Sequence, residues 1–141
     1  MSETNLKPLN WTPNPDIGYT VYRRQDGGMN YTFTDVSKET LSHWRGFSLE
    51  HLLDSDRLTR NLYDIRQISK IPPEAIKVAV ELANDPSARN IRLAVVVTED
   101  LARKTIEEIA ALINPGGLEM AIFTEMDEAE NWLNRPLTQL V

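Results

Sequence analysis

The run "IRLAVVVT" at residues 91–98 constrains the fold more than any other stretch of the chain. Its apolar residues are continuous instead of alternating, which is typical of a strand covered on both faces. Such strands occur mainly in parallel sheets, because the crossover between two parallel strands carries a helix over the sheet. The run therefore predicts an α/β domain.

The segments around this run alternate between strand and helix patterns. "IGYTVYRR" and "MNYTFTDV" are two alternating, β-rich runs on either side of "QDGG", which predicts a hairpin. Further strands are expected in "RNLYDI", "IRLAVVVT" and "LEMAIFT", and helices in "SKETLSHWRGFSLEHLLDSD", "PPEAIKVAVELAND", "TEDLARKTIEEIAALIN" and "TEMDEAENWL". The order ββαβαβαβα predicts an α/β fold with a mixed, mostly parallel five-stranded sheet and about four helices. Gly46 lies within the first helical segment and indicates a break into two short helices.

Two parts of the chain differ in pattern. Residues 1–16 hold three prolines and little periodicity, so we expect an irregular N-terminal arm. Residues 17–141 carry all of the expected strands and helices. A chain of 141 residues suits a single domain, which we place at residues 17–141.

Composition and charge narrow the classes of function. The net charge of −6 and the pI near 4.9 argue against a nucleic-acid binder, which usually has a basic face. The absence of cysteine excludes thiolate chemistry and thiolate metal sites. No apolar run reaches the length of a membrane span, and the N-terminus lacks the pattern of a signal peptide. We therefore expect a cytoplasmic protein with no integral membrane segment.

The motifs of the common enzyme classes are missing from the sequence. There is no Walker loop, no dinucleotide fingerprint, no G-x-S-x-G and no H-E-x-x-H. His43 and His51 are the only histidines, and their spacing on one helix would place them two turns apart, too far to share a metal ion. We expect no catalytic residue, no cofactor and no metal site, so an enzyme is the less favoured class.

Aromatic side chains are the first candidates for a binding site. Trp44, Phe47 and Tyr63 belong to segments that we expect to meet in a common apolar region. Core packing is the first interpretation of this region. A pocket for an apolar, lipid-like molecule beneath residues 38–54 is the second, because an imperfectly packed helical cover can leave a cavity.

Two charged residues lie at the end of the strand "NLYDI". Asp64 ends this strand at the edge where α/β proteins gather functional residues, and Arg66 comes two residues later. Asp64 could bind a ligand or cap the turn through its carboxylate. Arg66 could bind a ligand or pair with Asp64. We favour the structural role for Asp64 and keep both as candidate ligand-binding residues.

The succession of a hairpin, a helix, "NLYDI", a helix, "RLAVVVTED", a helix and "LEMAIFTEMDEAENWL" resembles the SpoIIAA-like branch of the STAS superfamily. The resemblance covers roughly residues 17–135, and its most suggestive parts are the strand "RLAVVV" and the end "MAIFTEMDEAENWL". It implies a mixed sheet with helices packed against it. STAS domains typically act as binding or regulatory modules, some of them switched by phosphorylation, and the fold also resembles lipid-carrier domains.

The phosphorylation switch is not carried over by this resemblance. Anti-sigma antagonists in the superfamily have an Asp-Ser-Ser-Gly type motif where the helix after this strand begins, whereas this sequence reads "SKIPPEAI". Pro72 and Pro73 stand about where the phosphoacceptor serine would be, and proline cannot accept phosphate. Ser69 lies upstream and does not match the motif.

Two functions follow from these observations. The first is a non-catalytic regulatory or protein-interaction module with a STAS-like fold that lacks the phosphoacceptor serine. The alternative is a carrier or sensor of an apolar, lipid-like small molecule. The expected partner is accordingly a protein or an apolar small molecule, and an edge strand or apolar helix residues such as Trp132 and Leu133 could support a homodimer.

Overall fold

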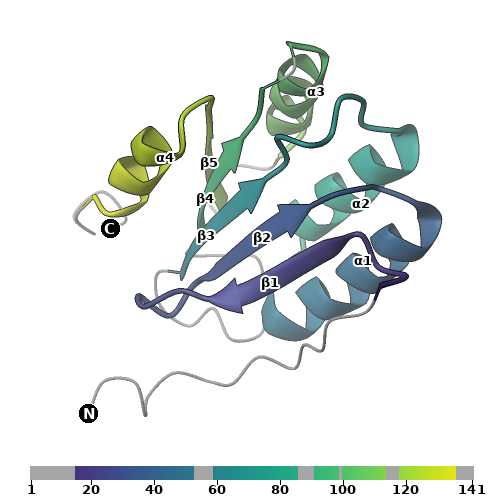
Figure 1. Ribbon diagram of the computed structural model, residues 1–141, viewed down its shortest axis with the longest axis horizontal. Helices are drawn as coiled ribbons and strands as arrows, with labels where there is room; N and C mark the ends of the chain where they lie inside the picture. The colour runs from purple at the N-terminus through teal and green to yellow at the C-terminus, as the bar shows by residue number, and fades with distance from the viewer. Residues whose placement is uncertain (1–14, 53–58, 86–90, 99, 114–117, 136–141) are drawn as a thin grey trace.

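A five-stranded sheet organises the protein (Figure 1). The computed structural model describes residues 15–52, 59–85, 91–98, 100–113 and 118–135. The strands are β1 (Tyr19–Arg23), β2 (Met29–Phe33), β3 (Thr59–Asp64), β4 (Ile91–Val96) and β5 (Leu118–Phe123). They lie in the sheet in the order β1-β2-β3-β4-β5, with β1 antiparallel to β2 and every later pair parallel. The predicted mixed, mostly parallel sheet is confirmed.

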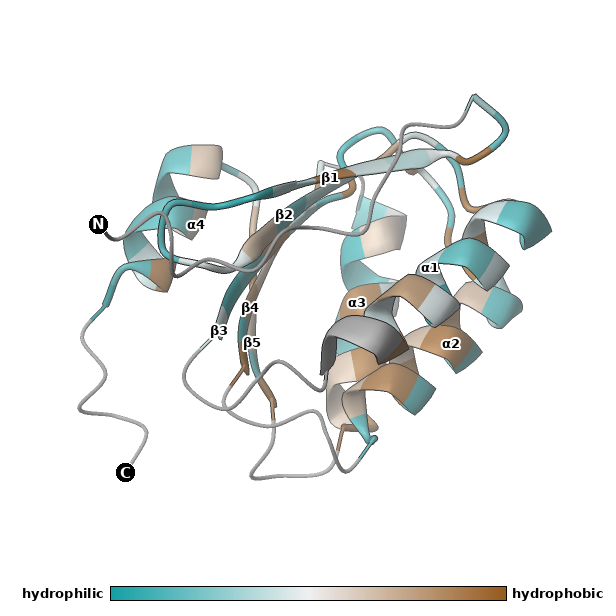
Figure 2. Cartoon of the chain, turned by 90° about the horizontal axis from the view of Figure 1, so that it is seen from below, coloured by the Kyte–Doolittle hydropathy of each residue, from teal (hydrophilic) through white to brown (hydrophobic). Residues whose placement is uncertain are grey.

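Within the described residues, four helices cover the two faces of this sheet (Figure 2). They are α1 (Lys38–Leu52), α2 (Pro73–Ala83), α3 (Asp100–Ala111) and α4 (Met126–Leu133). Helices α1, α2 and α3 lie side by side over one face, which we call the three-helix face. Helix α4 lies over the other, the α4 face, against β3, β4 and β5. The predicted order ββαβαβαβα is confirmed. The expected arm falls almost entirely on residues 1–14, which lie outside the described residues.

Helix α1 is continuous, so the predicted break at Gly46 is wrong. A Cβ at this position would meet nothing within 4 Å, and the residue is exposed on the outer side of the helix. Glycine in a helix interior costs about 1 kcal/mol relative to alanine. The burial of Leu41, Trp44 and Phe47 on the opposite side of α1 offsets that cost.

Because side chains alternate along a strand, each strand contributes one set of residues to the three-helix face and another set to the α4 face. The residues of β2 that point into the three-helix face are Met29, Tyr31 and Phe33, and all three are buried. Asn30 and Thr32, which alternate with them on β2, point to the α4 face. Strand β4 is buried along its whole length, because helices cover both of its faces as its continuous apolar run predicted.

A small apolar cluster attaches α4 to the sheet. Its five buried residues are Leu62, Ala94, Val96, Ala129 and Leu133, and each is at most 1% exposed. Three of them come from adjacent strands and two from α4, four residues apart on one side of the helix. This spacing explains why a helix as short as α4 packs on the sheet.

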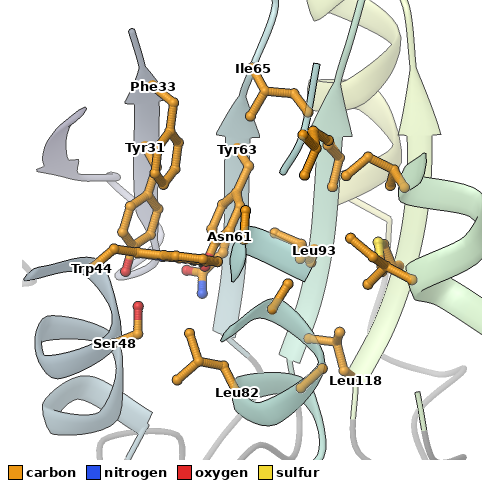
Figure 3. Close-up of a pocket in the computed structure, with 18 of the residues that line it drawn as sticks. Tyr31, Phe33, Trp44, Ser48, Asn61, Tyr63, Ile65, Leu82, Leu93 and Leu118 are labelled. Carbon is orange, nitrogen blue, oxygen red and sulfur yellow. Dashed lines mark hydrogen bonds between the residues drawn. The ribbon is translucent and has the colours of Figure 1, made fainter. Parts of the chain in front are cut away.

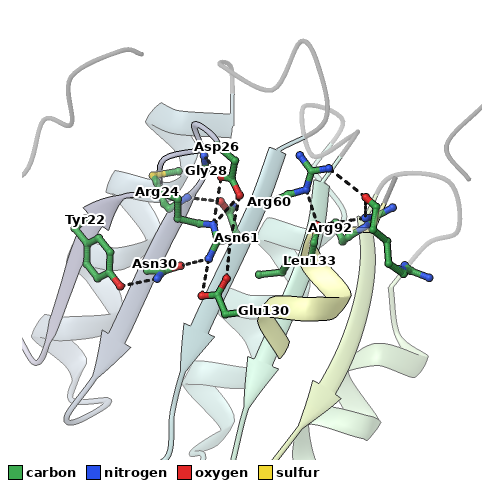
Figure 4. Close-up of polar contacts among 12 residues, drawn as sticks. Tyr22, Arg24, Asp26, Gly28, Asn30, Arg60, Asn61, Arg92, Glu130 and Leu133 are labelled. Atoms are coloured by element: carbon green, nitrogen blue, oxygen red, sulfur yellow. Dashed lines mark hydrogen bonds and ion pairs between the residues drawn. The ribbon is translucent and has the colours of Figure 1, made fainter. Parts of the chain in front are cut away.

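Two arginines hold the C-terminal end of α4 (Figure 4). Arg92 is fully buried and donates hydrogen bonds to the carbonyl oxygens of Leu133 and Arg135, at 3.3 and 2.9 Å. Arg60, its neighbour on β3, donates to the same two carbonyls. The last carbonyls of a helix have no partner within the helix and carry partial negative charge, so the two guanidinium groups stabilise this end.

Glycine lets β2 begin close to β3. A Cβ at Gly28 would lie 1.6 Å from the carbonyl oxygen of Arg60, so no larger residue fits here without moving the backbone. The preceding Gly27 has φ 93°, a conformation that L side chains rarely adopt. Just beyond, the Asn61 side chain accepts a hydrogen bond from the backbone N–H of Met29 at 2.9 Å. The turn thereby fixes Asn61 on the three-helix face.

Candidate functional site

A cavity of about 140 Å³ lies between the three-helix face of the sheet and helices α1, α2 and α3 (Figure 3). Side chains from β2 to β5 and from all three helices line it, and most of them are aliphatic or aromatic. The lining side chains with a hydroxyl or amide group are Tyr31, Ser48, Thr59, Asn61 and Tyr63. Among the described residues, none of the lining side chains is charged. This composition is that of a site for an apolar molecule with a few directed polar groups.

The sequence of α2 explains the empty space. Ala75, Ala79 and Ala83 follow at intervals of four, which places them on one side of the helix, and all three line the cavity. A methyl group fills little of the gap between helix and sheet. Side-chain size along α2 therefore creates the cavity, and an irregular α1, as the sequence had led us to expect, is not needed.

Four of the polar side chains of the cavity gather near α1 and the middle of β2 and β3, those of Tyr31, Ser48, Asn61 and Tyr63 (Figure 3). The Trp44 indole N–H donates to the Tyr63 hydroxyl at 3.4 Å, and the two rings meet edge to face. The Tyr31 hydroxyl donates to the Met29 sulfur at 3.8 Å. These contacts hold two phenol groups and one indole at the same end of the cavity.

Burial sets the protonation state of these phenols. Desolvation, and next the proximity of Tyr63, raise the pKa of Tyr31 well above its usual value. Desolvation raises the pKa of Tyr63 to about 12. The Ser48 hydroxyl lies close enough to both phenols to oppose part of this rise in pKa, yet its Oγ has no partner within hydrogen-bond geometry in the described structure. Both tyrosines are neutral at physiological pH, so the cavity wall offers hydrogen bonds without charge.

The comparison with protein families identifies the architecture around this cavity. The family model SpoIIAA-like matches residues 32–134, which is more than half of the chain. The chain belongs to the SpoIIAA-like family. No curated protein and no solved structure matches it in the corresponding comparisons. The resemblance drawn from the residue patterns is thus confirmed, together with the STAS-type fold.

The structure of this SpoIIAA-like chain brings two of the three aromatic candidates to the cavity. Trp44 and Tyr63 line it. Phe47 instead packs in an aromatic cluster with Tyr19 and Tyr31, with ring centroids 6.4 and 6.1 Å away, and it is not among the lining residues. Phe47 therefore supports the wall from behind, as a core residue does.

The charged candidates lie elsewhere. Asp64 is paired in register with Val96, whose side chain belongs to the α4 face, and it does not line the cavity. Its carboxylate accepts two hydrogen bonds from the Arg66 guanidinium and one from the Arg66 backbone N–H. Burial alone would raise the pKa of Asp64, but these hydrogen bonds outweigh it and lower the pKa. The pair closes the turn after β3, and the cavity lies on the opposite face of the sheet.

The remaining features of the described residues add no second site. His43 is exposed, and its Nδ1 hydrogen-bonds the Tyr19 hydroxyl at 2.8 Å, while the His51 side chain lies outside the description. No group of three or more histidine, aspartate or glutamate side chains in the described ranges could hold a metal ion. None of the helices described is both long and apolar enough to cross a membrane.

Sequence reasoning missed the residues that shape the cavity most. The alanine stripe of α2 was visible as three alanines spaced by four, but small residues on a helix face are common in ordinary cores. Ser48 and Asn61 carried no signal of a place in a cavity, because a serine in a helix and an asparagine in a strand are individually unremarkable. Only their placement at one end of an apolar cavity distinguishes them.

Proposed function

We propose that this SpoIIAA-like protein is a non-catalytic binding module that takes up a small apolar molecule in the cavity under α1, α2 and α3. The cavity is the observation that carries the proposal. Cavities of about 150 Å³ lined by aliphatic and aromatic side chains stay dry and bind molecules the size of benzene. The cavity of about 140 Å³ therefore suits a ring or a short branched chain.

The chemistry of the wall supports binding without catalysis. General acid–base catalysis near neutral pH needs a group whose pKa lies near 7. The two lining tyrosines have raised pKa values, and the described lining residues include no carboxylate, lysine or histidine. A bound molecule would thus be held and oriented but not activated.

A regulatory or protein-interaction role is the second part of the proposal, and membership of the SpoIIAA-like family supports it. The proposed regulation does not use a phosphoacceptor serine at the start of α2. Pro72 is the N-cap residue of this helix and Pro73 is its first residue, while Ser69 is exposed in the preceding loop. Cavity occupancy, rather than phosphorylation, would then be the signal that the module passes to its partner.

Toluene binding tests the cavity proposal. We expect saturable binding, seen as shifts of the isoleucine and leucine methyl signals in NMR spectra, and a higher unfolding temperature at saturation. Ala79→Leu fills the cavity and should abolish both effects. Ala110→Leu places the same side chain on the exposed side of α3 and should leave both effects unchanged. Equal binding by wild type and Ala79→Leu, or no binding by wild type, would contradict the proposal.

The interaction role has a separate test. Tagged wild-type protein and Ala79→Leu are used for quantitative affinity purification from the source cells, beside a tag-only control. We expect a partner enriched by wild type and enriched to a different degree by Ala79→Leu, because the filled cavity mimics one occupancy state. Equal enrichment by both proteins would mean that partner binding does not depend on the cavity. No enrichment by either protein would argue against the interaction role.

A further inference from the structure

We infer that the cavity selects an apolar ligand that carries one neutral hydrogen-bond acceptor, such as the carbonyl oxygen of a ketone or ester, and that Ser48 and Asn61 bind this oxygen. The inference deepens the proposed function and rests on it. It comes from two of the five polar side chains in a mostly apolar wall, those of Ser48 and Asn61 (Figure 3).

Ser48 supplies the first group. The residue is 7% exposed, lines the cavity, and its Oγ is buried with no hydrogen-bond partner in the described structure. A buried hydroxyl without a partner is destabilising, and proteins rarely keep one without a reason. Figure 3 shows this hydroxyl pointing from α1 toward the aromatic end of the cavity. The phenols of Tyr31 and Tyr63 lie nearby but outside hydrogen-bond geometry, so a ligand atom at this place would give the hydroxyl its first well-aligned partner.

Asn61 supplies the second group, a donor. Its Oδ1 accepts the backbone N–H of Met29 at 2.9 Å, and this hydrogen bond fixes the orientation of the side-chain amide. The Nδ2 then points the other way, into the cavity and to the same end as Ser48 (Figure 3). A hydroxyl and an amide N–H₂ at the same end of the cavity match an acceptor oxygen better than a donor, because the amide nitrogen can only donate.

The lack of charged side chains among the described lining residues indicates that this oxygen is neutral. A carboxylate in an apolar cavity needs a cation beside it, because an unpaired buried charge is very unfavourable. No charged side chain is among the described lining residues. Arg23 lowers the pKa of Tyr31 by its charge, but Arg23 does not line the cavity and donates to the Gly27 carbonyl. A ketone or ester oxygen fits this surrounding.

A pair of probes with the same shape tests the inference. Cyclohexanone and methylenecyclohexane differ only in that a carbonyl oxygen replaces a methylene group. Their dissociation constants are measured by NMR titration for wild type, Ser48→Ala and the control Ser42→Ala, whose serine is exposed on α1. We expect Ser48→Ala to weaken cyclohexanone about fivefold, the size of one hydrogen bond, and methylenecyclohexane less than twofold. Ser42→Ala should change neither constant.

The other outcomes distinguish a failure of this inference from a failure of the proposed function. If Ser48→Ala leaves the affinity for cyclohexanone unchanged, or weakens both probes equally, the polar anchor is wrong while the apolar cavity stands. If cyclohexanecarboxylate at pH 7 binds wild type more tightly than cyclohexanone, the neutrality of the acceptor is wrong. If neither probe binds wild type, the proposed function itself is overturned. The methylenecyclohexane constant also reports whether Ser48→Ala has kept the cavity intact.

Discussion

The two faces of the sheet are covered in different ways. The three-helix face is apolar and aromatic and is covered by three helices, yet a cavity of about 140 Å³ remains beneath them. The α4 face is covered by the eight residues of α4, and its five buried apolar residues are each at most 1% exposed. A larger apolar interface is thus the less completely filled one.

Small residues have opposite effects on the packing of the two faces. On the α4 face, small residues such as Ala94 and Ala129 let the helix approach the sheet closely. The buried Arg92 binds the carbonyl oxygens at and just after the end of the helix. On the three-helix face, small residues of α2 lie opposite the sheet while α1 and α3 hold the helix layer in place, so the same kind of residue leaves space. Alanine permits close packing on the α4 face and leaves a cavity on the three-helix face. Its effect depends on whether the helix backbone can move closer to the sheet.

Truncating one leucine on each face gives the largest expected effects. Leu133→Ala should lower the free energy of unfolding by about 3–4 kcal/mol, because Leu133 is fully buried in a filled cluster. Leu82→Ala should cost about 2 kcal/mol, because Leu82 already borders the cavity and loses fewer contacts. Urea unfolding followed by circular dichroism measures both. Equal or reversed losses would contradict the conclusion that the α4 face is more completely filled than the three-helix face.

Enlarging one alanine on each face should separate the faces further. Ala129→Leu should cost about 2–3 kcal/mol, since no atom can move aside easily in the cluster under α4. Ala75→Leu places the same added carbons in the cavity and should change the free energy of unfolding by less than about 1 kcal/mol. The two variants are compared by thermal and urea unfolding. A large loss from Ala75→Leu would mean that the space is not available to a side chain.

The two faces should also respond to opposite ends of the pH scale. The pKa of Tyr63 is raised to about 12, so its stabilisation is complete below pH 10, the usual tyrosine value, and is lost as the pH rises above it. The pKa of Asp64 is lowered, so its contribution is complete above about pH 4 and is lost as the pH falls further.

Urea unfolding across the pH range checks this expectation. Tyr63→Phe should reduce the alkaline fall in stability by about 2 kcal/mol, the part due to Tyr63. Tyr31, whose pKa burial also raises, should keep part of the fall in this variant. Asp64→Asn should flatten the acid fall by a smaller amount, since its ion pair with Arg66 is partly exposed to solvent. Tyr22→Phe, which changes a tyrosine that is 58% exposed, is the control. An alkaline slope that Tyr63→Phe leaves unaltered would contradict the assignment.

Much of the fold could be predicted from the sequence because its signals are local. The continuous apolar run of β4 indicated cover on both faces, and the alternation in β1 and β2 indicated a hairpin. The break expected at Gly46 was wrong because helix propensity is a weak local preference, which the packing of α1 against the sheet overrides. Of the candidate site residues, Trp44 and Tyr63 were recognisable as aromatics of one apolar region, although nothing local distinguished lining from core.

The sequence by itself determined the order of the elements, the alternation of the two hairpin strands, the continuous apolar run of β4, and the family. Only the tertiary structure decided which layer stays open, because a cavity is a small difference between the volume of side chains and the space between helices and sheet. It also decided the partners of polar groups far apart in the chain, such as Arg24 and Glu130, 106 residues apart and 2.9 Å from each other. The unpartnered hydroxyl of Ser48 belongs to the same class, since hydrogen-bond satisfaction depends on every neighbour at once.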